Sequence, residues 1–551
     1  MKKPLFFLIP PIVIVLLVMG VFYFDRGNPA GTDTTFYMDL SYYISAGGRF
    51  LVDYVDYRLP VFPLILSPIY KLGLSDFANR YILLSFVYSA YSLIIYGLSL
   101  TITKSRRKSL VISLISFISI SSRLFDDGRY IAVPLFYHAL ELAGVLILLK
   151  FMLNDIRAFL KRKIVFLCAI AGGLSGLAFS GRQVHIFAPL LVLLFIAWKI
   201  YKEKSSIFKN YNLWTMALSF AAGFAAMGSW MLFIFYTPNI NFFYLLKKWL
   251  IDFPPLTYFR QDANIFIDTA RKTFFTLNTA LPELMNLGIN LPLFWFVYVL
   301  AIGFFYQILV TSGINIKQEL LNFYNQYKKH ILLILTLGLM AIVTVLATGG
   351  GASRHDGPFF TLYSAVFALL LARLDYNKDI RKAGFIIFVL IFTLSPLKNF
   401  YKQEAKSYQA SNKQIGTEMF NSKIAKALKE AGAGKKTTVL VLGDYPIVGR
   451  LVGYKPFAGQ ITDDLIYIIP KLFKDKPDYA DKFFQQMKNI DIAYKTPGYP
   501  NLKWSYGMRE DKTNVIYRYI ENYLTLNFKA VASVDDRATI YKRIRQIELK
   551  P

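Results

Sequence analysis

The sequence predicts a polytopic α-helical membrane protein with a small C-terminal α/β domain. Hydrophobic residues make up 55 % of the 551 residues, and several apolar runs reach the ~20 residues that cross a bilayer. From about residue 397 these runs stop, and shorter strand and helix patterns alternate. We therefore expect a membrane domain over 1–396 and an extracytoplasmic α/β domain over 397–551.

The membrane domain is expected to contain about eleven spans. Their predicted ranges are 4–24, 80–102, 109–121, 131–152, 164–180, 186–200, 212–236, 291–311, 331–347, 358–373 and 383–396. The first run is longer than the apolar core of a signal peptide, and no small-residue cleavage site follows it closely. We expect it to remain as an uncleaved first span.

Basic residues predict the orientation. The chain carries a net charge of +28, and every even-numbered connection between predicted spans is basic. These connections contain Arg106, Lys161, Lys202, Lys328 and Arg381. Basic connections stay in the cytoplasm, so we expect a plasma-membrane protein with a cytoplasmic N-terminus and an extracytoplasmic C-terminal domain. The same distribution explains the net charge without a nucleic-acid partner.

Cysteine and histidine content limits the redox and metal chemistry. The one cysteine, Cys168, lies inside an apolar run, which excludes an intrachain disulfide and a thiolate metal cluster. Only four histidines occur, which argues against a His-rich metal site. We therefore expect no cofactor and assign no metal ligands from composition.

The first outer connection, 25–79, is rich in charge and aromatic residues. Asp33 or Thr34 can cap a short amphipathic helix that Gly47 and Gly48 end, and this helix is expected to lie in the membrane interface. A second short segment should begin near Pro60. The charged residues that follow the first helix are Arg49, Asp53, Asp56 and Arg58.

Charge recurs in the other outer connections and once inside a span. Candidate residues are Asp126 and Asp127 in 122–130, Arg182 in 181–185, Arg354 and His355 in 348–357, and Glu141, near His138, in the fourth span. Carboxylates can act as a general base, and guanidiniums bind phosphate through two hydrogen bonds. Ionisable residues inside a membrane are functional candidates. Each candidate also has a structural interpretation instead of a catalytic one. It can cap a helix, be a solvated loop charge, anchor the chain to lipid, or be a buried acid whose hydrogen bonds are satisfied.

The first outer connection resembles that of the GT-C glycosyltransferases. The resemblance is to the polyprenyl-phosphate-sugar-dependent group, which includes protein O-mannosyltransferases and the aminoarabinose transferases of lipid A. Asp33 matches the catalytic aspartate of that group. The run Asp56-Tyr57-Arg58-Leu59-Pro60 is similar to its acidic–basic–Pro-Pro motif, with leucine in place of one proline.

Three further motifs carry the resemblance along the chain. Asp126 or Asp127 stands where the family has a second acidic residue. The stretch Gly176–Gln183 is similar to a Gly-x-Ala…Lys-Gln segment, with Arg182 in place of lysine. Arg354 and His355 resemble the basic pair that binds the donor phosphate before a late span.

The resemblance implies transfer of a sugar from a polyprenyl-phosphate donor to a lipid, glycan or protein acceptor, with inversion at the anomeric centre. Asp33 would be the general base, and Arg58, Arg182 and Arg354 would hold the phosphate, with Asp53 and Asp56 nearby in the sequence. Oligosaccharyltransferase relatives use a divalent ion, so the resemblance leaves open whether Asp33 and Asp126 bind a metal ion.

Two alternative functions remain. A polymerase or ligase of lipid-linked oligosaccharide shares the predicted topology, and product length would distinguish it. A lipid or glycan transporter should show inverted repeats and interrupted helices, and the sequence shows neither.

The C-terminal domain is predicted from five segments. Residues 437–442 and 489–494 are expected to form strands, 477–488 and 514–526 helices, and 529–542 further strands. Gly443-Asp444 ends the first strand without a glycine-rich phosphate motif, so we interpret it as structural.

Overall fold

The computed structural model describes most of the predicted helices and the C-terminal sheet. The described residues are 5–24, 32–47, 61–74, 76–123, 132–153, 161–181, 183–202, 211–234, 333–341, 357–373, 423–442, 452–461, 487–495, 515–536 and 538–544, with seven single positions between 247 and 331. They belong to two compact units, which we describe separately.

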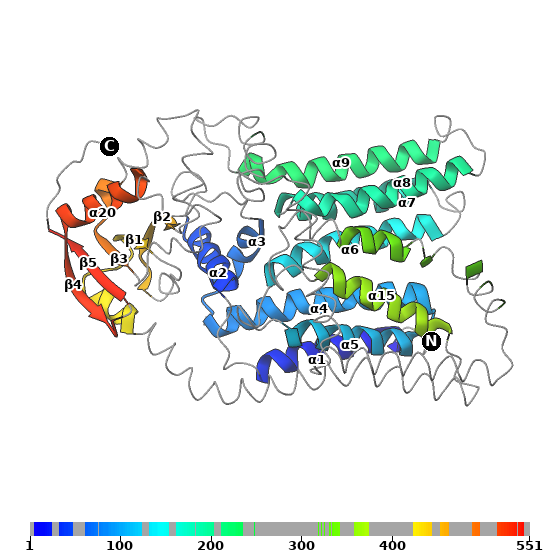
Figure 1. Ribbon diagram of the computed structural model, residues 1–551, viewed down its shortest axis with the longest axis horizontal. Helices are drawn as coiled ribbons and strands as arrows, with labels where there is room; N and C mark the ends of the chain where they lie inside the picture. Colours follow the sequence, from blue (N-terminus) through cyan, green and yellow to red (C-terminus); the bar gives the residue numbers. More distant parts are fainter. Residues whose placement is uncertain are drawn as a thin grey trace. The chain divides into compact units, whose positions relative to one another are not determined.

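The first unit is a helical bundle (Figure 1). It contains α1 (Leu5–Phe24), the greater part of α4 (Asp76–Thr103), α5 (Arg106–Arg123), α6 (Ala132–Leu153), α7 (Lys161–Gly181), α8 (Phe187–Lys202), nearly all of α9 (Tyr211–Ile234) and α15 (Gly357–Arg373). Each of these helices coincides with a predicted span. Residues 333–341 are helical within the predicted span 331–347, and the predicted spans 291–311 and 383–396 lie outside the described residues.

Two described helical stretches, Ala78–Thr103 and Arg162–Gly181, are long and apolar enough to cross a membrane by length and composition. The bundle also exposes large apolar side chains: Phe166, Leu194 and Leu218 are 64 %, 64 % and 66 % exposed. Inside it, polar side chains such as Ser92 and Ser113 are fully buried. Exposed apolar side chains and buried polar ones within the apolar core suit a hydrocarbon environment, because interhelical polar contacts form there while apolar side chains face lipid.

Helices α7 and α9 meet through glycines. Gly172, Gly176 and Ser180 recur every four residues on α7, the spacing that lets membrane helices approach closely. A Cβ atom at Gly172 would collide with the carbonyl oxygen of Phe220, and Ser180 donates a hydrogen bond of 2.8 Å to the carbonyl of Gly228. This packing fixes the last turns of α7, where the chain passes toward α8.

The second unit begins with two short helices, α2 (Thr32–Ser45) and α3 (Val61–Tyr70), as the sequence predicts. Gly47 adopts a φ of +94° and ends the first helix, and the Tyr37 and Phe62 rings pack edge to face at 6.0 Å. Helix α2 already begins at Thr32, so Asp33 lies in its first turn instead of preceding the helix as a cap.

A five-stranded sheet forms the core of the second unit, with the order β2-β1-β3-β5-β4. Strand β1 (Thr438–Leu442) runs parallel to β2 (Lys455–Ile461) and β3 (Ile492–Lys495), while β5 (Ala538–Arg543) runs antiparallel to β3 and to β4 (Phe528–Val534). The predicted strands are confirmed, and β2 is an addition that the sequence analysis missed. The predicted helix 477–488 lies outside the described residues except at its end, where Met487–Asn489 form a 3-10 turn.

Helices cover both faces of this sheet (Figure 1). Leu440 and Leu442 point to the face covered by α20 (Val515–Asn527), and Val439 and Val441 point to the face covered by the helical residues 423–430. This alternation is the two-residue period of a strand buried on both sides.

Helix α2 also contacts β2, so the first short helices belong to the same compact unit as the sheet. The expected domain boundary near residue 397 lies outside the described residues and stays a prediction.

The predicted orientation can be tested by thiol labelling, because Cys168 is buried and Ser533 is exposed on β4. In a Cys168→Ser background, Ser533→Cys should react with a membrane-impermeant maleimide in intact cells. Arg162→Cys, at an exposed position on the side predicted to be cytoplasmic, should react only after lysis. The reverse pattern would contradict the orientation.

Candidate functional site

Most residues predicted to act in the site belong to the outer connections. Asp53, Asp56, Arg58, Asp126, Asp127, Arg182, Arg354 and His355 lie outside the described residues. Asp33 is the second residue of α2. Glu141 is the exception, because its side chain and its surroundings are both described.

Glu141 and His138 lie three residues apart on α6, a spacing that places both on one face of the helix. Each side chain is only 1–2 % exposed, and the His138 Nδ1 and Glu141 Oε2 atoms are 3.4 Å apart. The two residues therefore face each other inside the bundle instead of pointing to its surface.

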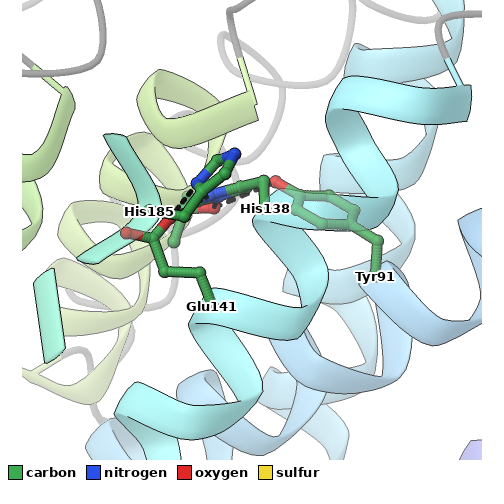
Figure 2. A network of polar contacts seen from close by, with 5 residues as sticks. Tyr91, His138, Glu141 and His185 are labelled. Carbon is green, nitrogen blue, oxygen red and sulfur yellow. Dashed lines mark hydrogen bonds and ion pairs between the residues drawn. The ribbon is translucent and has the colours of Figure 1, made fainter. Parts of the chain in front are cut away.

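His185 completes the cluster from another segment. It lies in η2 (Gln183–Ile186), the 3-10 turn between α7 and α8, and its Nδ1 atom is 2.8 Å from the same Glu141 oxygen (Figure 2). The side chain is 4 % exposed. One carboxylate oxygen thus joins the middle of α6 to the turn that starts α8.

Thr361 extends the contacts to α15. Its Oγ1 atom is 2.8 Å from His138 Nε2 and 3.3 Å from the hydroxyl of Tyr91 on α4. One turn later Ser364 donates a hydrogen bond of 3.0 Å to Ser116 on α5. These contacts form a buried polar network of Tyr91, Thr361, His138, Glu141 and His185.

The network has the donor groups to satisfy a buried carboxylate. A carboxylate without partners is costly in an apolar interior, and ring N–H groups lower that cost by hydrogen bonding. The ligand atoms of His138, Glu141 and His185 all lie within 4.8 Å of one another. Such a cluster can share a proton, or it can hold a metal ion.

The network also joins chain segments that follow three predicted outer connections. His138 lies about two turns beyond 122–130, His185 closes 181–185, and Thr361 lies just beyond 348–357. Their contacts show that these three points of the bundle meet. The sequence analysis had selected the same three connections because they carry charged candidates.

Sequence reasoning found part of this cluster. Glu141 was predicted as a candidate, and His138 was noted beside it. The sequence analysis missed the roles of His185, Thr361 and Tyr91, which come from three other segments. The one available signal was a histidine in a short turn between two apolar runs, only three residues after Arg182.

Thr361 gives a direct test of the network. Thr361→Val removes a hydroxyl that contacts both His138 and Tyr91, so we expect a loss of about 1–2 kcal/mol of stability, measured by thermal unfolding of the purified protein. Thr361→Ser keeps the hydroxyl and should retain most of the stability. Equal unfolding temperatures for the parent and Thr361→Val would contradict these contacts.

Comparisons with known proteins give structural neighbours only. No family model and no curated protein sequence matches the chain. Among solved structures, it is similar to ArnT from Cupriavidus metallidurans bound to undecaprenyl phosphate, with 12 % identity, 98 % of this chain and 99 % of that chain covered, and a TM-score of 0.49.

The chain is also similar to the archaeal oligosaccharyltransferase AglB from Archaeoglobus fulgidus in complex with an inhibitory peptide and a dolichol-phosphate. The identity is 13 %, 88 % of this chain and 69 % of that chain are covered, and the TM-score is 0.45. Both proteins are members of the GT-C superfamily, the group that the sequence resembles.

Proposed function

We propose that this chain is an integral membrane glycosyltransferase that transfers a sugar from a polyprenyl-phosphate-linked donor to an extracytoplasmic acceptor. One observation carries the proposal: the buried network joins three points of the bundle that lie within, or up to about two helical turns beyond, the charged outer connections. We infer that the charged groups of these connections act together at one site.

The phosphate-binding part of the proposal concerns two arginines. Arg182 precedes His185 by three residues, and Arg354 precedes Thr361 by seven. Because His185 and Thr361 belong to the same network, we assign both guanidiniums to one anionic group, the donor phosphate. A guanidinium suits this role because it presents two parallel N–H donors to phosphate oxygens and stays charged.

The chemical step is an inverting displacement. Asp33 takes the proton of an acceptor hydroxyl, the acceptor oxygen bonds to the anomeric carbon, and the bond from that carbon to the phosphate oxygen breaks. The electron pair of the broken bond remains on the polyprenyl phosphate. Arg182 and Arg354, with Arg58 and His355, stabilise the charge of this leaving group.

The position of Asp33 suits a base that must be ionised. It is the second residue of the 14-residue helix α2, and a negative charge in a first helical turn interacts favourably with the helix dipole. Asp56 and either Asp126 or Asp127 are assigned to donor contacts and to the second acidic position, on the sequence resemblance.

Asp33→Asn tests the proposed chemistry. Asparagine has the size of aspartate and is also accepted near a helix start, so the protein should fold and bind donor. Loss of the base should lower turnover about 10²–10⁴-fold. The measurement is transfer from a radiolabelled polyprenyl-phosphate sugar by purified protein, with thermal stability measured in parallel.

Asp39→Asn is the matched control, because Asp39 lies on the same helix and matches no motif position. It should retain turnover within a small factor of the parent. An active Asp33→Asn protein would contradict the proposed base. Loss of turnover accompanied by loss of thermal stability would assign Asp33 a structural role instead.

A further inference from the structure

We propose that His138, Glu141 and His185 form a binding site for one divalent transition-metal ion, with Zn²⁺ as the preferred ion. The ligand atoms are Nδ1 of both histidines and Oε2 of the glutamate. Its ligands are residues other than the assigned base and phosphate-binding arginines, and it does not depend on sugar transfer. It differs from the expectation drawn from the low histidine content.

The distances between ligand atoms fit a shared metal. His138 Nδ1 and Glu141 Oε2 are 3.4 Å apart, which is longer than an ordinary N–H···O hydrogen bond. Two ligands of a tetrahedral zinc ion, each about 2.0–2.1 Å from the metal, are separated by about 3.4 Å. His185 Nδ1, at 2.8 Å from the same oxygen, needs to move away by only about half an ångström to reach that separation.

The donor set also fits. Two imidazoles and one carboxylate are ligands that catalytic zinc sites use, with a fourth position for water or another group. Nitrogen and carboxylate ligands suit Zn²⁺, whereas Ca²⁺ and Mg²⁺ prefer oxygen ligands alone. The spacing of three residues between His138 and Glu141 on α6 presents two ligands from one helix.

Thr361 supplies the outer contact that a metal-binding histidine requires. Its Oγ1 atom lies 2.8 Å from His138 Nε2. When Nε2–H donates to this oxygen, Nδ1 keeps its lone pair and faces the Glu141 carboxylate. Two acceptors then face each other, and a cation between them makes the arrangement favourable.

Burial gives the ion an electrostatic role. All three residues are buried, and an ionised carboxylate in an apolar bundle is costly without a compensating positive charge. A divalent ion supplies that charge and connects α6 to the turn before α8. Metal binding would therefore hold the segment that follows Arg182 against the bundle.

Cobalt binding to the purified, tag-free protein tests the site directly. After treatment with a chelator, the parent should bind about one Co²⁺ per chain, with the visible absorption of a four-coordinate nitrogen and oxygen site, and Zn²⁺ should displace it. Glu141→Gln and His185→Gln should lose this absorption. His330→Gln, which removes a histidine outside the cluster, should keep it.

Thr361→Val and Thr361→Ser give a second readout that does not remove a ligand. Loss of the outer contact should weaken Co²⁺ binding on the order of 10–100-fold, and the serine variant should restore it. If the ligand variants fail to fold, the two Thr361 variants and the spectrum of the parent protein still test whether the metal site exists. Absence of saturable Co²⁺ binding by the parent, or unchanged binding by folded Glu141→Gln or by Thr361→Val, would overturn the site.

The metal and the transferase are tested by different measurements. Cobalt binding needs no donor or acceptor, and the loss of transfer expected for Asp33→Asn is measured without Co²⁺. A parent protein that binds Co²⁺ as expected but transfers no sugar would support the metal site and contradict the proposed function. The reverse result would contradict the metal site alone.

Discussion

The buried carboxylate of Glu141 is the constraint on which the polar interior of the bundle depends. A buried carboxyl group requires partners, and here they are His138 on the same helix and His185 in the turn before α8. Thr361 then links His138 to α15 and, through Tyr91, to α4. Satisfying this one carboxyl group thus holds together segments far apart in the sequence.

Glycine packing and this network act on neighbouring parts of the same helix. Gly172 and Gly176 bring α7 against α9 so closely that side chains at these positions would meet backbone atoms. Immediately after the end of α7, the chain turns and places His185 beside Glu141. Close helix contact and buried hydrogen bonds together determine where the segment after Arg182 lies.

The helices could be predicted from sequence because each depends on a local apolar run. The polar cluster could be predicted only in part, because a buried glutamate reveals that partners must exist and not which residues supply them. His185 and Thr361 are 44 and 220 residues from Glu141 along the chain, and no local pattern connects such positions.

In the sheet, too, a strand with a local apolar pattern could be predicted, and a strand that depends on tertiary contacts could not. Strand β1 is a continuous apolar segment and was predicted, whereas β2 reads Lys-Pro-Phe-Ala-Gly-Gln-Ile and lacks a strand pattern. Its place in the sheet comes from pairing with β1, a tertiary contact. The start of α2 differs from the prediction by two or three residues, because capping residues define a helix end only approximately.

The central claim is that the segments joined by the network bind a polyprenyl phosphate, and native mass spectrometry with undecaprenyl phosphate measures it most directly. We expect the parent and Arg162→Ala, a change at the opposite end of α7, to bind one lipid, and the Arg182→Ala/Arg354→Ala double variant to bind at least about tenfold more weakly. Equal binding by the double variant and the parent would contradict the account.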